Sequence, residues 1–270
     1  MNKRVVKNII IKEWYLTLHD MNSSMLITVL PLLVIGQMIL VIFLVFRFTN
    51  LSEISIGLIL NSIDVAAKTF PFISQLPLRE QLLSLMIMQM PLYMLLIPVM
   101  IGIYFATFSI IEEKTQRTLE PLLATPASTE DILLAKGLSA LIPAYAMTLI
   151  CYVITVSAVG LIFGFQHTRI LLSYIWLMGV IFLSPLLGLL AFLLGVMTSA
   201  KHTDVKQAQN FSLFIIFPIF GLIGLQFTGI IPLNALTILG YIAVLILIDY
   251  LLLKSAVSVF SRSKILTNWK

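Results

Sequence analysis

The chain has 270 residues, of which 60% are hydrophobic and only 11% are charged, and its formal net charge is +5. About a quarter of the residues of an ordinary soluble domain are charged, so this composition excludes a protein that is soluble by itself. The basic residues lie at the ends of apolar blocks and not on one compact face, which argues against nucleic-acid binding.

The apolar residues form long blocks, each close to the length of about 20 residues that a helix needs to cross a bilayer. Backbone groups in lipid must be paired within the protein, and blocks of this length favour helices over a barrel. We therefore predict an all-α polytopic integral membrane protein.

Residues 1–24 are predicted to form an amphipathic helix that lies in the membrane interface. Its apolar side chains recur every four positions, at Val6, Ile10, Trp14 and Leu18. A frayed tail in water is the alternative. The first apolar block begins near residue 25 and is longer than the core of a signal peptide, so we expect it to be retained as a span.

Six spans are predicted within a single domain of residues 1–270. They cover residues 25–46, 86–111, 137–165, 171–198, 211–228 and 235–253. Residues 47–85 are expected to form an outer segment, and Pro91 and Pro98 are expected to bend the second span. The polar residues 112–136 and the tail 254–270 lie outside the spans.

The distribution of Lys and Arg predicts the orientation. Six spans put both ends of the chain on one side of the membrane, together with residues 112–136. Thirteen Lys and Arg residues then lie on that side and four on the other. Because loops rich in Lys and Arg remain in the cytoplasm, both termini and residues 112–136 are expected to be cytoplasmic.

The sequence has no motif that is typical of an enzyme. It contains no GxxxxGK[ST] loop for a nucleotide and no HExxH or GxSxG motif, and its three histidines are far apart along the chain. No catalytic residue, metal site or bound cofactor is therefore predicted. Asp249 is the charged residue nearest to the middle of a span, and it is close enough to Lys254 to reach the membrane interface.

Three glutamines lie within or at the ends of the predicted spans: Gln37, Gln89 and Gln226. Each could line a path for a substrate or, more commonly, form a hydrogen bond between helices. Gly160 and Gly164 form a GxxxG pair, which would let two helices approach closely.

Residues 112–136 form the longest strongly polar interruption of the apolar sequence. Within them, Leu119, Leu122 and Leu123 have helical spacing and form a small apolar ridge, while Pro126 ends the helix. A short helix with an apolar ridge and a charged rim suits docking in a groove of a soluble partner. It suits a position flat on lipid headgroups equally well.

The same segment resembles a known family. Its sequence Glu113-Lys114, Arg117-Thr118-Leu119-Glu120-Pro121-Leu122-Leu123-Ala124-Thr125-Pro126 and Lys136-Gly137 closely resembles the cytoplasmic signature of type-2 ABC transporter permeases. Arg117 stands where many members of this family have glycine. The stretch with Asp204, Lys206 and Gln207 is similar to the family's second cytoplasmic loop.

The resemblance implies the type-2 ABC exporter permease fold, with a cytoplasmic coupling helix between the second and third spans. It implies contacts with an ATP-binding subunit through Glu113, Arg117, Thr118, Leu119, Glu120, Leu122, Leu123 and Pro126, and a second contact through Asp204, Lys206 and Gln207. It further implies two permease chains, identical or similar, and two ATP-binding subunits that bind ATP and Mg²⁺. This arrangement points to the cell membrane of a bacterium or archaeon.

Two other function classes remain open. A polytopic scaffold or assembly protein, with no role in transport, could use residues 112–136 to recruit a different soluble protein. A membrane-embedded enzyme is the third class, although the sequence shows no paired acid, base or nucleophile. The sequence does not predict the substrate.

Overall fold

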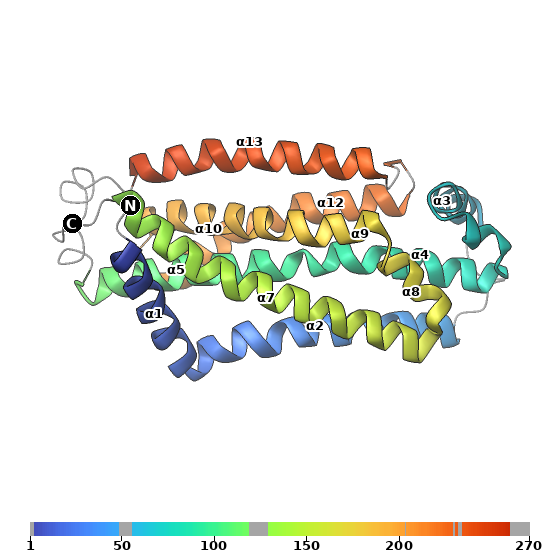
Figure 1. The fold of residues 1–270 in the computed structure, drawn as a ribbon, viewed down its shortest axis with the longest axis horizontal. Coiled ribbons are helices and arrows are strands. Elements are labelled where there is room, and N and C mark those ends of the chain that lie inside the picture. Colours follow the sequence, from blue (N-terminus) through green and yellow to red (C-terminus); the bar gives the residue numbers. More distant parts are fainter. Residues whose placement is uncertain are drawn as a thin grey trace.

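The computed structural model describes residues 3–48, 56–118, 129–202, 204–228, 230–231 and 234–259. Within these ranges the secondary structure is helical and contains no β-strand, which confirms the all-α prediction. The long helices run side by side along the longest axis of the molecule, and helix α1 runs at a steep angle to them near one end (Figure 1).

The described part of the chain contains long helices and several short helical turns. In chain order they are α1 (Lys3–His19), α2 (Met21–Phe48), α3 (Ile56–Thr69), the 3-10 helix η2 (Pro71–Gln75), α4 (Leu78–Met94), α5 (Leu96–Thr115), α7 (Thr129–Phe163), α8 (Phe165–Leu171), α9 (Tyr174–Met178), the π-helical turn η3 (Gly179–Leu183), α10 (Ser184–Lys201), α11 (Val205–Ser212), the 3-10 turn η4 (Leu213–Ile215), α12 (Ile216–Phe227) and α13 (Ala235–Val259).

Five helical stretches of the described chain are long and apolar enough to cross a membrane. They are Ser23–Phe48, Leu78–Thr115, Glu130–Phe163, Tyr174–Ala200 and Ala235–Ser258. Each of them overlaps one of the predicted spans. The remaining predicted span, 211–228, falls on α11, η4 and α12, a helical run that is interrupted by the 3-10 turn. A sixth crossing therefore stays a prediction.

The second long stretch begins at Leu78, before the predicted start at residue 86. Pro77 stands at its N-cap, where no backbone N–H is needed for an intrahelical bond. The stretch divides at Leu95 into α4 and α5. Pro98 lacks the N–H that would bond to the carbonyl of Met94, which accounts for the interruption here, whereas Pro91 lies inside α4. Residues 78–85 are therefore helical and continuous with the second long stretch.

The connection between α7 and the fourth long stretch also differs from the expected one. Gly164 has a φ of 100°, a conformation that favours glycine, and it ends α7 so that the short helix α8 follows. The fourth stretch begins at Tyr174 and not at residue 171. A Cβ at Gly164 would meet nothing within 4 Å, and Gly160 packs against the ring of Phe165. Within this GxxxG pair, Gly164 forms the turn, and Gly160 lets Phe165 and Thr168 of α8 pack closely against α7.

Helix α1 packs on the bundle with a face that only partly matches the predicted stripe. Its buried residues are Val6, Ile9, Glu13 and Thr17, whereas Leu18 is 60% exposed. A helix has 3.6 residues per turn, so a stripe with a strict spacing of four drifts away from the contact. The indole Nε1 of Trp14 donates a hydrogen bond to the carbonyl oxygen of Ser139 at 2.9 Å, which ties α1 to α7.

Asp249 is buried against the bundle, whereas we expected its side chain to extend towards the membrane interface. It is only 5% exposed, and both of its carboxylate oxygens are buried without a hydrogen-bond partner. It lies 11 residues after Ile238 and 7 before Ala256, which are both buried. These separations are close to whole numbers of helical turns, so the carboxylate is on the face of α13 that packs against the bundle.

The closest helix packing is between α5 and α10. A Cβ at Gly102 in α5 would lie 2.7 Å from the carbonyl oxygen of Gly188 in α10, and a Cβ at Gly195 would lie 2.6 Å from the Cβ of Ala106. Small residues let two helix backbones approach where no apolar side chain could fit. The glycines therefore fix how α5 and α10 are placed.

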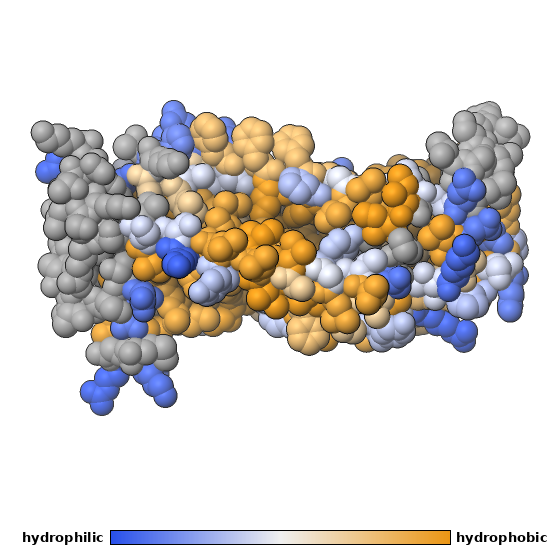
Figure 2. All heavy atoms as spheres, turned by 90° about the horizontal axis from the view of Figure 1, so that it is seen from above, coloured by the Kyte–Doolittle hydropathy of each residue, from blue (hydrophilic) through white to orange (hydrophobic). Residues whose placement is uncertain are grey.

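The outer surface is apolar over much of its length. Most residues in the apolar windows of α2 and α13 are not buried, and large hydrophobic side chains such as Leu33, Phe43, Leu236 and Leu247 are exposed. In Figure 2, apolar residues cover the middle of the visible face and hydrophilic residues gather towards its two ends. Such a surface is stable in lipid and not in water, as expected for a multi-pass membrane protein.

We expect Gly102→Ala to lower the apparent melting temperature of the purified protein in detergent. The added methyl group would meet the backbone oxygen of Gly188, and overpacking of this kind costs about 1–3 kcal/mol. The matched control is Gly36→Ala in α2, where a Cβ meets nothing within 4 Å and alanine favours the helix. Equal melting temperatures for the two variants would contradict the close packing of α5 and α10.

Candidate functional site

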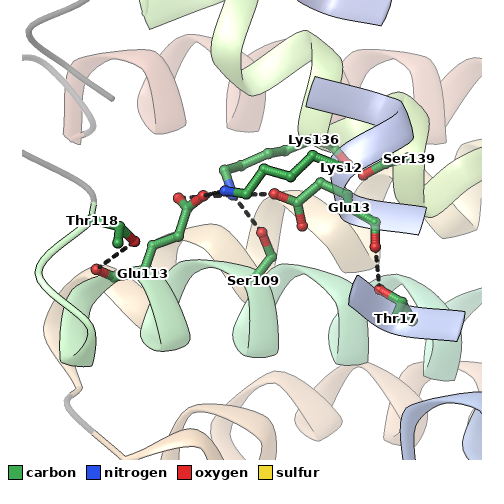
Figure 3. A network of polar contacts seen from close by, with 8 residues as sticks. All are labelled: Lys12, Glu13, Thr17, Ser109, Glu113, Thr118, Lys136 and Ser139. Carbon is green, nitrogen blue, oxygen red and sulfur yellow. Dashed lines mark hydrogen bonds and ion pairs between the residues drawn. The ribbon is translucent and has the colours of Figure 1, made fainter. Parts of the chain in front are cut away.

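A buried ion network joins three helices at one end of the bundle (Figure 3). Lys136 of α7 lies between two carboxylates, with its Nζ 2.9 Å from Oε1 of Glu13 in α1 and 2.9 Å from Oε2 of Glu113 in α5. Lys136 also donates a hydrogen bond to the hydroxyl of Ser109 in α5. The network therefore connects residues that are more than 100 positions apart in the sequence.

The network is charge-balanced. Lys12 supplies the second cation, with its Nζ 2.7 Å from Oε1 of Glu113. Burial opposes the charge of Lys12, but the hydrogen bond and the charge of Glu113 outweigh this effect and raise the pKa of the ammonium group. Lys136, Glu13 and Glu113 are 1%, 4% and 6% exposed. Two cations and two anions thus compensate one another, with the side chain of Lys12 47% exposed and the other three charged groups buried.

Sequence reasoning missed the central part of this network. We assigned Glu113 to a contact with a partner and did not single out Glu13 or Ser109. In the structure, Glu113 directs its carboxylate into the chain and not to an exposed rim. A signal was present in α1, because Glu13 follows Val6 and Ile9 at helical spacing and so shares their buried face.

A second polar contact joins α5 to the end of α10. The Nζ of Lys114 donates hydrogen bonds to the carbonyl oxygens of Ser199, Ala200 and His202, at 3.1, 3.3 and 3.1 Å. These carbonyls have no partner within the helix, and the negative end of the helix dipole favours a cation there. Lys114 therefore fixes the end of α10 to the end of α5.

The turn that leaves α5 has the hydrogen bonds of a Schellman motif. The N–H of Thr118 bonds to the carbonyl of Glu113 at 3.0 Å, and the N–H of Arg117 bonds to the carbonyl of Lys114 at 3.2 Å. Arg117 has a φ of 56°, in the left-handed region that glycine adopts without strain. Arg117 therefore occupies, with backbone strain, a position that glycine would adopt without strain.

Most of the predicted coupling helix lies outside the described residues. This concerns Leu119, Glu120, Leu122, Leu123 and Pro126. The described residues on either side belong to the end of α5 and the start of α7, so the segment between them connects two helices of the ion network. Thr118 is the last described residue before it, and its hydroxyl lies 3.5 Å from the carbonyl oxygen of Glu113.

The second predicted contact lies at the start of α11. Asp204 is the N-cap residue, and its carboxylate accepts a hydrogen bond from the N–H of Lys206 at 3.3 Å. Asp204, Lys206 and Gln207 are exposed. Since α11 follows directly after the end of α10 that Lys114 contacts, this exposed turn is close to the end of α5.

Two of the three predicted substrate-path residues line the same cavity, at a distance from the ion network. Gln37 of α2 and Gln89 of α4 both border a cavity of about 760 Å³, together with residues of α5 and α12. Gln226 belongs to α12, but its side chain lies outside the described part of the structure. Among the described residues, no group of three or more His, Cys, Asp or Glu side chains could hold a metal ion.

We expect Lys136→Met to destabilise the protein strongly, because it leaves two carboxylates buried around an apolar side chain. Removing one partner from a buried ion pair costs about 3–5 kcal/mol. The triple variant Lys136→Met, Glu13→Gln, Glu113→Gln removes the buried charges together and should recover much of the loss. Thermal unfolding in detergent measures both effects, and an unchanged melting temperature in Lys136→Met would show that the network does not stabilise the fold.

We expect Arg117→Gly to be at least as stable as the parent and Arg117→Val to be less stable. Glycine relieves the left-handed strain, whereas a β-branched residue at positive φ increases it, and such backbone strain costs about 1–3 kcal/mol. The measurement is limited proteolysis of the purified protein, with cleavage near residues 112–118 followed by mass spectrometry. Faster cleavage of Arg117→Gly than of Arg117→Val would contradict the assigned turn.

Comparison with known families gives a match. Residues 7–231 match the family described as ABC-2 family transporter protein, a range that includes the ion network, residues 112–136 and the cavity. No curated protein matches the chain. Together with the apolar helices, the match identifies the membrane component of a transporter, and the chain belongs to the ABC-2 transporter family.

Proposed function

We propose that this chain is the permease subunit of an ATP-driven exporter and that a separate ATP-binding subunit drives it through residues 112–136. The observation that carries the proposal is the ion network between α1, α5 and α7. Residues 119–128 connect α5 directly to α7, and buried charges hold these helices to each other and to α1. A displacement of the segment by a partner would therefore move all three helices together.

The contact with the partner is built on the apolar ridge of Leu119, Leu122 and Leu123. Thr118, Glu120 and Pro126 flank this ridge in the sequence, and Arg117 sets the direction in which the chain leaves α5. Glu113 supports the contact from within, because its carboxylate holds α5 to Lys12 and Lys136. Asp204, Lys206 and Gln207 form a second contact near the same end.

The partner supplies the chemistry that this chain lacks. The sequence contains no phosphate-binding loop, so ATP and Mg²⁺ bind to the ATP-binding subunit. Two such subunits act on two permease chains, identical or similar, and closure of the ATP-bound pair opens the substrate path to the outside.

The positions of the helix ends support the proposed orientation. The start of α1, the ends of α5 and α13 and the start of α7 lie at the same end of the bundle in Figure 1. This end carries most of the Lys and Arg residues, so it faces the cytoplasm of a bacterial or archaeal cell.

A scaffold or assembly protein without transport activity is the alternative function. It would also use residues 112–136 to bind a soluble protein, but it would not need an ATPase. Purification of the complex from its native membrane distinguishes the two, since the exporter should retain an ATP-binding subunit in equal amount.

We expect Leu122→Asp to uncouple the complex while the permease still inserts into the membrane. A charge on the apolar ridge would be buried against the partner, and the loss of a central interface residue costs about 2 kcal/mol or more. This corresponds to an affinity about 30-fold weaker. The measurement is binding of the ATP-binding subunit, and its ATPase activity, with the permease reconstituted in lipid.

Leu122→Met is the matched control, because it keeps an apolar side chain of similar volume at the same position. It should retain both binding and ATPase activity. Full coupling in Leu122→Asp would remove the support for a leucine ridge as the contact.

A further inference from the structure

A network of hydrogen bonds joins α8 to α4 at the end of the bundle opposite to the ion network. In Figure 1, α8 lies towards the right and α1 lies towards the left. Four residues take part, and we call them the α4–α8 network: Glu80 and Ser84 of α4, and Gln166 and His167 of α8. His167 is 1% exposed, whereas Gln166 is on the surface.

The contacts of the α4–α8 network close into a ring. Nδ1 of His167 is 3.3 Å from the hydroxyl of Ser84, and Nε2 is 3.4 Å from the amide nitrogen of Gln166. The same amide donates a hydrogen bond to the carboxylate of Glu80 at 3.0 Å. The hydroxyl of Ser84 donates to the backbone carbonyl of Glu80 at 2.8 Å. Each of the four residues therefore bonds to two of the others.

The directions of these bonds determine the protonation state of His167. The hydroxyl of Ser84 gives its one hydrogen to the carbonyl of Glu80, so it accepts from His167. The amide of Gln166 turns its nitrogen to the Glu80 carboxylate, which would repel the amide oxygen, so this nitrogen also donates to Nε2. His167 is therefore neutral, with its hydrogen on Nδ1 and a lone pair on Nε2.

A proton on Nε2 is incompatible with the α4–α8 network. Nε2 would become a donor that points at a second donor, the amide nitrogen of Gln166. An amide that turned its oxygen to Nε2 would lose its bond to Glu80. The charged imidazole would also be buried, which is costly. Because Gln166 is exposed, a movement of this one side chain admits water, and with it a proton, to Nε2.

The environment of His167 makes the network sensitive to pH. Burial lowers the pKa of His167, and the nearby carboxylate of Glu80 opposes this effect without outweighing it. The neutral form then stabilises the folded protein fully above the ordinary histidine pKa of about 6.5. This stabilisation is lost as the pH falls from there through the lowered pKa of the folded state. The network is therefore stable at neutral pH and weakened by acid.

The other titratable groups of the neighbouring helices are directed away from His167. Arg79 of α4 donates to a carbonyl in the last turn of α2, and Arg169 of α8 is exposed. The hydroxyl of Tyr152 in α7 donates to a carbonyl at the end of α8, and Tyr174 at the start of α9 is exposed. The carboxylate in the network is therefore the anion available to a protonated imidazole.

We propose that Nε2 of His167 is a proton-binding site and that the bound proton releases α8 from its position on α4. The proton adds to the lone pair of Nε2, and no covalent bond breaks. The imidazolium leaves Ser84 for the carboxylate of Glu80, about one helical turn earlier on α4. Because α8 connects α7 to the fourth long stretch, acid at this end shifts the connection between two apolar stretches. This end is the outer one in the orientation proposed above.

The first test is the protonation state of His167 in the unaltered permease. The protein is purified in detergent with isotope-labelled histidine, and the NMR shifts of the ring nitrogens are followed from about pH 8 to about pH 5. His19→Gln and His202→Gln assign the signals, since the chain has three histidines. We expect hydrogen on Nδ1 at high pH and a midpoint below about 6.5. Hydrogen on Nε2, or a midpoint at or above this value, would overturn the proposal.

The second test is the movement of α8. Nitroxide labels are placed at the exposed positions Leu78 in α4 and Arg169 in α8, with the buried Cys151 replaced by serine. Acid should shift the distance between the labels by up to about 5 Å, one helical turn, and it should not do so in His167→Gln. An unchanged distance at a pH at which NMR shows His167 protonated would refute the release of α8.

His167→Gln keeps a polar side chain that cannot be protonated, and His19→Gln is the matched control at an exposed histidine. On acidification, the melting temperatures of the parent and of His19→Gln should fall by about 2–4 °C more than that of His167→Gln. Equal falls in all three would show that His167 does not carry the pH dependence. If His167→Gln fails to fold, the NMR titration and the labelled parent still decide the question. These tests use no ATP-binding subunit, so their failure leaves the Leu122→Asp result unaffected.

Discussion

The structure depends on a lysine that is buried between two carboxylates. A single buried charge would be very unfavourable, but Lys136 has Glu13 on one side and Glu113 on the other, and Lys12 balances the second carboxylate. These side chains come from α7, α1 and α5. In the observed placement of the three helices every buried charge is paired, and a shift that broke one of these pairs would leave a buried charge without its partner, which is costly.

Further contacts join α10 to the three helices of the ion network, and we call α1, α5, α7 and α10 together the α1–α5–α7–α10 unit. Gly102 and Gly188 bring the backbones of α5 and α10 close together, and Lys114 holds the end of α10 to the end of α5. By contrast, α2 is mostly exposed. The cavity lies where α2 and α12 meet α4 and α5. Under the proposed function, movement of the α1–α5–α7–α10 unit relative to α2 and α12 would change the shape of this cavity.

Local sequence patterns predicted which segments form helices better than they predicted which residues of those helices contact one another. The apolar blocks predicted the five long helical stretches. Pro98 indicated the interruption of the helix between α4 and α5. The predictions failed where packing against another helix determines whether a side chain is buried. Asp249 was expected at the interface because Lys254 is near in sequence, yet its place on the packed face of α13 buries it. Glu113 was expected on the surface because the segment around it is polar, yet two lysines from other helices turn it inwards.

The sequence by itself determined that the chain is a helical membrane protein, and its polar segment resembled the family to which it belongs. Composition and block length suffice for the first conclusion, because every helix that crosses lipid must satisfy the same local requirement. Only the tertiary structure decided that Glu13, Glu113 and Lys136 form one network and that Gln37 and Gln89 share one cavity. Burial and charge pairing arise between helices that are distant in the sequence, and a periodic pattern within one helix does not specify which neighbour it will face.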